Sequence, residues 1–137
     1  MLHINFRCEP YSANIVFYAD ATSKQVNNHM KKKYNVDMNC EPEDAGAQCK
    51  VRPDTEGSSL IYFLWIRNRE DIAVLVHECI HLAFDILSDR DIPVTPEDNE
   101  ALAYYHNYLF KTLWNEMVVY TEKKNSKKKA KENANCG

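Results

Sequence analysis

Features that mark secreted and membrane proteins are missing from this sequence. No apolar run approaches the roughly 20 residues that a membrane-spanning helix needs. Residues 1–7 lack the basic start and the apolar stretch of a signal peptide, so we expect none. Both absences favour a cytoplasmic protein with no membrane partner.

Paired cysteine motifs are also missing. The chain has an odd and scattered set of cysteines with no Cys-x-x-Cys pair: Cys8, Cys40, Cys49, Cys79 and Cys136. This usage is typical of reduced thiols in a cytoplasm rather than of a disulfide framework.

Charge is placed unevenly along the chain. Residues 121–137 hold six lysines and two glutamates, a net charge of +4, and the whole chain carries −3, which leaves −7 for residues 1–120. An acidic body does not suggest a specific nucleic-acid partner. A short lysine run can touch nucleic acid or membrane, but it is more often a solvated end. We expect one domain over residues 1–120 and a basic, disordered tail over 121–137.

Apolar periodicity predicts a small α+β domain. Residues 2–6 alternate apolar and polar side chains and residues 14–18 are rich in β-forming types, so the two segments are expected to pair antiparallel. A helix follows to about Tyr34. Residues 48–52 indicate a weak edge strand, whereas the almost wholly apolar run 59–66 predicts a central strand. The expected fold is a small, mainly antiparallel sheet with a covering helix and a layer of two further helices.

The first of these further helices carries the pattern His77-Glu78-Cys79-Ile80-His81. Helical residues four apart lie on one face, so both histidines can hold one metal ion with Glu78 beside them. Two histidines and an adjacent carboxylate on a rigid helix suit a zinc hydrolase. The alternative, a core helix with hydrogen-bonded histidines, would bury polar groups without a cation. The expected core stripe is Ile72, Val76, Ile80, Ala83 and Leu87, widened by Leu75, Leu82 and Ile86.

A second helix should begin at about Pro96, because Thr95 is a suitable N-cap and proline suits the first helical position. A zinc site needs a third protein ligand. Glu100 lies one turn into this helix, away from its apolar stripe, and could reach an ion held by the histidines. Asp85, Asp98 and His106 are competing candidates.

The chain resembles the gluzincin branch of the zincin metallopeptidases in its His-Glu-x-x-His pattern and in Asn99-Glu100, where Glu100 follows His81 by nineteen residues. It is most similar to the minigluzincins and to small metallopeptidases encoded by phages and prophages. The resemblance implies that His77, His81 and Glu100 bind Zn²⁺ in a two-helix zinc-binding layer and that Glu78 is the general base. Tyr104 stands where thermolysin-like sequences have a ligand-orienting aspartate, so the surroundings of the ligands differ.

The expected activity is hydrolysis of peptide bonds in peptide or protein substrates. Glu78 would take a proton from a zinc-activated water. A further hydrogen-bond donor is needed for the tetrahedral intermediate, and Tyr104 is our choice over Tyr105 and His106. The alternative function is a catalytically weak or inactive, zinc-stabilised protein-binding module. A third interpretation, an interaction protein without metal, requires the motif to be a coincidence.

Overall fold

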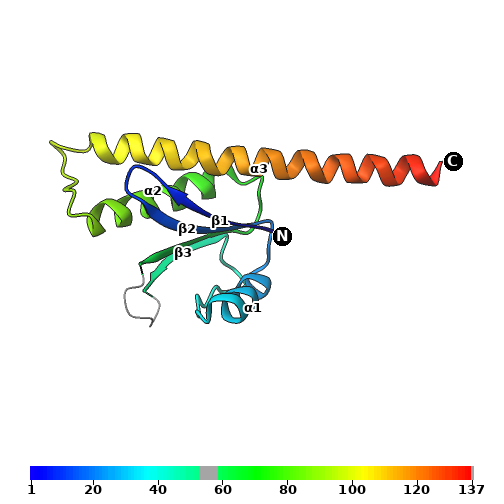
Figure 1. Ribbon diagram of the computed structural model, residues 1–137, viewed down its shortest axis with the longest axis horizontal. Coiled ribbons are helices and arrows are strands. Elements are labelled where there is room, and N and C mark those ends of the chain that lie inside the picture. The colour runs from blue at the N-terminus through cyan, green and yellow to red at the C-terminus, as the bar shows by residue number, and fades with distance from the viewer. Residues whose placement is uncertain (53–58, 137) are drawn as a thin grey trace.

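The computed structural model describes residues 1–52 and 59–136 of the chain (Figure 1). Its elements, in order, are β1 (Leu2–Cys8), β2 (Ala13–Ala19), α1 (Ser23–Tyr34), β3 (Gly46–Val51), β4 (Ile61–Ile66), α2 (Ile72–Asp89) and α3 (Glu100–Asn135). The fold is α+β, as the periodicity of the sequence predicts. The first two residues of the predicted strand 59–66 lie outside β4.

The four strands form one mixed sheet in the order β1-β2-β4-β3. The outer pairs β1–β2 and β3–β4 are antiparallel, whereas the central pair β2–β4 is parallel. A parallel pair needs a long crossover, and the segment that contains α1 and β3 supplies it here. The expected edge position of the strand near residue 48 is confirmed, because β3 ends the sheet on one side.

Helices cover both faces of the sheet. Alternate residues of the two central strands point to opposite sides: Val16 and Phe63 pack with α1, whereas Phe17 and Leu64 pack with α2 and α3. This double burial explains why the central strands are almost continuously apolar in the sequence. The layers are therefore α1, the sheet, and the α2–α3 pair (Figure 1).

Local side-chain contacts determine where the helices begin. Thr22 and Gln25 form a reciprocal capping box at the start of α1. Asp71 caps α2 by accepting a hydrogen bond from the Val74 N–H.

The predicted start of α3 near Pro96 is wrong. The Thr95 side chain does accept from the Asp98 N–H, but Thr95 and Asp98 also exchange backbone hydrogen bonds that close a local turn, and α3 begins only at Glu100.

The lysine-rich segment that we expect to be disordered is helical in the structure, because α3 continues through it to Asn135. Lysine, glutamate and alanine all have good helix propensity, which allows α3 to propagate beyond the sheet.

Among the described residues, no helix combines the length and the apolar character that crossing a membrane requires.

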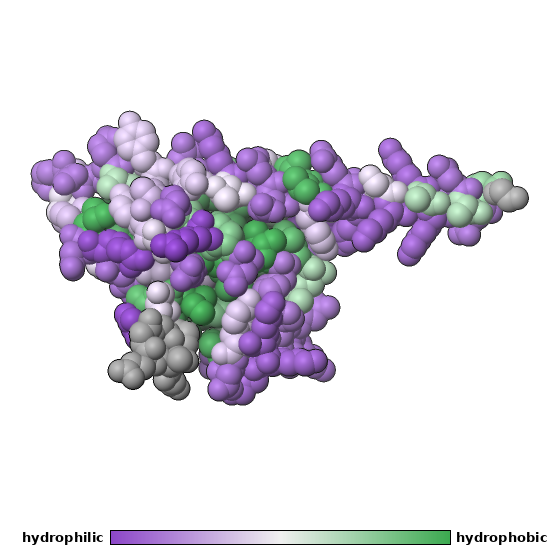
Figure 2. All heavy atoms as spheres, in the orientation of Figure 1, coloured by the Kyte–Doolittle hydropathy of each residue, from purple (hydrophilic) through white to green (hydrophobic). Residues whose placement is uncertain are grey.

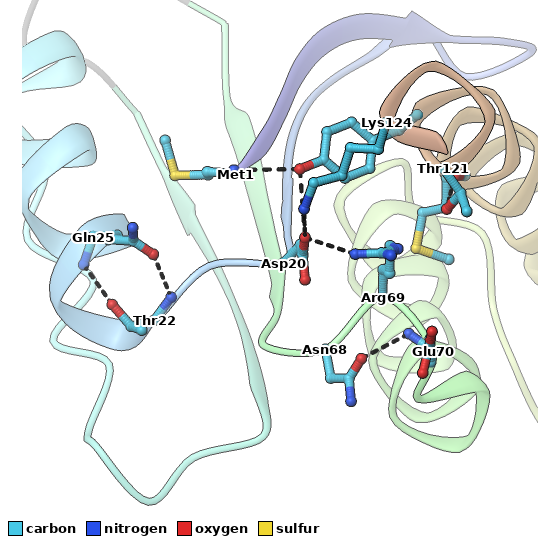
Figure 3. A network of polar contacts seen from close by, with 11 residues as sticks. Met1, Asp20, Thr22, Gln25, Asn68, Arg69, Glu70, Thr121 and Lys124 are labelled. Atoms are coloured by element: carbon cyan, nitrogen blue, oxygen red, sulfur yellow. Dashed lines mark hydrogen bonds and ion pairs between the residues drawn. The ribbon is translucent and has the colours of Figure 1, made fainter. Parts of the chain in front are cut away.

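A polar cluster around Asp20 ties α3 to the rest of the domain (Figure 3). The Asp20 carboxylate accepts hydrogen bonds from Arg69 at 2.8 Å and from Lys124 at 3.0 Å. The Met1 amine donates to the Tyr120 hydroxyl at 3.3 Å, and that hydroxyl donates to Asp20 at 3.4 Å. Burial alone would raise the pKa of Asp20, but the contacts with Lys124 and Arg69 lower it overall. The cluster joins the start of the chain, the end of β2, the approach to α2, and α3.

Two histidines fasten α1 to the first strands, and they should make the fold sensitive to acid. His3 hydrogen-bonds the Tyr34 hydroxyl at 2.9 Å, and His29 hydrogen-bonds the Tyr18 hydroxyl at 2.8 Å. Burial, with smaller contributions from His29 and Lys33, lowers the pKa of His3 from 6.5 to about 4. The unfolded chain therefore binds a proton at His3 at higher pH than the folded chain does. The free energy of unfolding should fall as pH decreases from 6.5 to about 4.

We expect the thermal midpoint of the wild type to fall more steeply across this pH window than that of the His3→Gln variant. Glutamine can still hydrogen-bond Tyr34 but does not titrate. Carboxylates titrate in both proteins, so the difference between the two curves isolates His3. Parallel curves from calorimetry at several pH values would contradict the assignment.

Candidate functional site

Helix α2 presents His77 and His81 to solvent because its opposite face is buried. The fully buried residues of α2 are Leu75, Cys79, Leu82, Ala83, Ile86 and Leu87. The predicted core stripe is wrong for Ile72, Val76 and Ile80, which are 47%, 38% and 43% exposed. Its other members are buried, as predicted: Leu75, Leu82, Ala83, Ile86 and Leu87. An apolar pattern all round α2 does not by itself select one face. The core lies opposite the histidines.

The two histidine rings lie close together, as their spacing predicts. Their Nε2 atoms are 3.2 Å apart, and the ring planes are inclined by 75°. Two nitrogen ligands of a tetrahedral zinc ion, each at about 2.0–2.1 Å from the metal, are separated by about 3.3 Å. The pair therefore fits two of the positions of a zinc site. The same distance also permits a direct hydrogen bond if one Nε2 is protonated.

Glu78 lies on the side of α2 that faces the edge strand β3, and it is half-buried. Burial raises the pKa of Glu78, the neighbouring His77 and His81 oppose this shift, and the carboxylate of Asp44 reinforces it. A carboxylate with a raised pKa beside a pair of imidazoles has the electrostatic setting of a proton acceptor.

Gly46, the first residue of β3, allows the strand to approach α2 closely. A Cβ atom at this position would lie 2.8 Å from Val74 Cγ1, 2.9 Å from the Trp65 carbonyl oxygen and 3.2 Å from Glu78 Cγ. Ala45 and Gly46 line a hollow of about 370 Å³ together with Ala73, Val74, His77 and Glu78. The motif on α2 and the edge of the sheet thus share one surface depression. Neither Gly46 nor Asp44 is among the residues predicted from the sequence, and only the contact of β3 with α2 identifies them.

The structure does not bring Glu100 and Tyr104 to the histidine pair. Glu100 is exposed at the first residue of α3, and within residues 1–52 and 59–136 no group of three His, Cys, Asp or Glu side chains is placed to hold a metal ion. Tyr104 is 73% exposed and lines a different hollow, beside Tyr11 in the β1–β2 turn. His106 contacts α2 next to the histidine pair, because its Nε2 is 3.2 Å from the carbonyl oxygen of Val76, the residue before His77.

Cys79, inside the motif, points into the core. Burial, with a smaller contribution from Glu78, raises the pKa of its thiol to about 12. The thiol is therefore protonated at neutral pH and packs as an apolar group. All five cysteines are unpaired, as the scattered pattern predicts.

No protein-family model, curated protein or solved structure matches this chain. The geometry at α2 and β3 is therefore the basis on which a function can be proposed.

Replacing Gly46 by alanine should destabilise the fold by about 1–3 kcal/mol, because the added methyl group overlaps Val74 and the Trp65 carbonyl oxygen. Urea unfolding measures this cost. In a Val74→Ala background the cost should be smaller but not zero, since the backbone contact persists. The close approach is disproved if alanine at position 46 is tolerated without loss of stability in both backgrounds.

Proposed function

We propose that this chain is a zinc-dependent peptidase. The observation that carries the proposal is the geometry on α2, where the Nε2 atoms of His77 and His81 are 3.2 Å apart next to the half-buried Glu78. In the proposal, His77 and His81 hold the ion and Glu100 is the third ligand. Bound zinc would supply a water of lowered pKa and would polarise the scissile carbonyl.

Glu78 acts in this proposal as the general base. It accepts a proton from the attacking water and passes it to the leaving amine. Its raised pKa, caused chiefly by burial, supports the role because the carboxylate is then a stronger proton acceptor than an exposed glutamate. Tyr104 as the donor to the developing oxyanion stays a prediction, which requires Tyr104 to leave its present place beside Tyr11.

The edge of the sheet supports a peptide as the substrate. Strand β3 pairs with β4 on one side and ends the sheet on the other. An extended peptide that added to this edge by backbone hydrogen bonds would run past the hollow that Gly46 shares with Glu78. The scissile bond of such a peptide would then lie near the proposed base without a separate substrate domain.

The alternative, a zinc-stabilised binding module without useful peptidase activity, is favoured by one observation. Glu100 is exposed, and the described residues contain no group of three His, Cys, Asp or Glu side chains that could hold a metal ion. For catalysis, the start of α3 and the connector at residues 90–99 have to move Glu100 toward His81. A protein that binds zinc through the two histidines alone would gain stability from the metal but would cleave no peptide.

Metal analysis tests the site itself. We expect about one zinc per chain in untagged wild-type protein by mass spectrometry, and loss of that zinc in His81→Ala. Glu100→Ala should weaken zinc binding if Glu100 is the third ligand, whereas Glu97→Ala, an exposed neighbour, is the matched control. Zinc at about 100 times its dissociation constant should stabilise the wild type by about 2.7 kcal/mol. Wild-type protein that binds no zinc after supplementation overturns the proposal.

Glu78→Gln tests catalysis separately from binding. The variant should retain zinc, because Glu78 is not a ligand in the proposal, and should lose roughly 10²–10⁴-fold in the rate of peptide cleavage. A panel of labelled peptides and unfolded proteins provides the assay. Cleavage at the wild-type rate by Glu78→Gln disproves the assigned base, and no cleavage by zinc-loaded wild type selects the binding module.

A further inference from the structure

The part of α3 that extends beyond the sheet has features that the proposed peptidase does not use. We call residues 121–135 the α3 arm. Figure 1 shows the arm projecting from the body of the molecule, and every side chain from Glu122 to Cys136 is exposed. In Figure 2 the projecting end is mainly hydrophilic. Propagation from the packed part of α3 accounts for the helical state of the arm, whereas the placement of its charges needs a further explanation.

The lysines of the arm are gathered on one face. At about 100° per residue, five of the six lie within an arc of about 140° centred close to the direction of Tyr120. These five are Lys123, Lys124, Lys127, Lys128 and Lys131. Lys129 lies on the opposite side. The arc coincides with the face that α3 buries in the body through Leu109, Leu113 and Met117, so a lysine face continues the buried face.

Gathering lysines on one face is unfavourable for a helix that contacts only water. Lysines four residues apart repel each other, and a solvated helix gains more from alternating glutamate and lysine at that spacing. In the described residues, Lys124 is paired with Asp20 and Lys128 with Glu132, the latter at 4.0 Å. Lys123, Lys127 and Lys131 have no such partner there. Their alignment is explained if a row of external negative charges lies along this face.

We infer that the lysine face of the α3 arm binds the phosphate backbone of a nucleic acid without reading its sequence. The side chains favour this partner over other anionic surfaces. Membrane-surface helices need an apolar face, and protein interfaces are depleted in lysine and anchored by apolar or aromatic groups. From Thr121 to Asn135 the only apolar side chains are alanines. A surface of lysines alone suits purely electrostatic contact, in which bound phosphates release their counterions.

The acidic body does not prevent this contact. Residues 1–120 carry −7, which repels a polyanion at long range. Lys127 and Lys131 lie about 10 and 16 Å beyond Tyr120 along the helix, and the Debye length at physiological ionic strength is about 8 Å. The repulsion at the arm is therefore largely screened. The arm also contains no aromatic side chain, so base stacking makes no contribution and a duplex should bind at least as well as a single strand.

Fluorescence anisotropy of the full chain with a labelled DNA duplex of about 20 base pairs tests the inference. Lys124 already donates to Asp20, whereas the Lys128–Glu132 pair is solvent-exposed and weak, so we count Lys123, Lys127, Lys128 and Lys131 as the four lysines that contact phosphates. The logarithm of the binding constant should then fall against the logarithm of salt concentration with a slope of about −3.6, a loss of about 150-fold between 50 and 200 mM salt. Lys127→Gln should weaken binding and make the slope less negative by about 0.9. Both effects should be the same for DNA duplexes of unrelated sequence.

Two controls separate the lysine face from mere positive charge. Lys129→Gln removes the same charge from the opposite side and should change the affinity and the slope less than Lys127→Gln does. The double variant Asn125→Lys with Lys127→Asn keeps composition and net charge but moves one lysine away from the face, and it should bind as weakly as Lys127→Gln. Circular dichroism checks that each variant keeps its helix.

The inference is overturned by three results: no binding at about 50 mM salt, equal losses in Lys127→Gln and Lys129→Gln, or equally tight binding of polyglutamate or of vesicles with anionic lipid. The last result would assign the arm to an acidic protein or a membrane surface. None of these measurements depends on zinc or on peptide cleavage, so the outcome is independent of the proposed function.

Discussion

Burial of one face of α2 against the sheet is the packing interaction on which the candidate site depends. Leu75, Cys79, Leu82 and Ile86 are removed from water completely, and their burial stabilises the helix by the free energy of transferring apolar surface. This choice of face turns His77 and His81 outward and directs Glu78 toward β3. The glycine at the start of β3 completes the arrangement, since any side chain there would separate the strand from the helix.

Electrostatics acts at two levels in this molecule. Within the site, burial of Glu78 and the nearby Asp44 raise the pKa of the proposed base, while the imidazoles oppose the shift. Away from the site, Asp20 accepts hydrogen bonds from Arg69, Lys124 and the Tyr120 hydroxyl at the point where α3 leaves the body. The acidic body and the basic arm are therefore joined at the Asp20 carboxylate, whose negative charge is paired with Arg69 and Lys124. Beyond Lys124, all described residues of the arm are exposed.

The main elements of the fold were predictable because they depend on local patterns. The alternation in β1, the apolar run of β4 and the helix expected to end at about Tyr34 each correspond to one element in the structure. The start of α3 was not predictable from Thr95 and Pro96, because a closed turn from Thr95 to Asp98 competes with helix initiation there. The helical state of the lysine-rich end was also missed, since its composition fits a solvated tail as well as a propagated helix.

The sequence by itself determined the identity and spacing of His77, Glu78 and His81, because helical periodicity alone brings residues four apart together. The almost wholly apolar run 59–66 also indicated a central strand, whereas the central position of β2 was not foreseen. Only the tertiary structure decided which side of the apolar helix α2 faces the core, which strand stands beside Glu78, and where Glu100 and Tyr104 lie relative to the histidines. These are long-range relations between segments, and they depend on packing between elements that local periodicity does not encode.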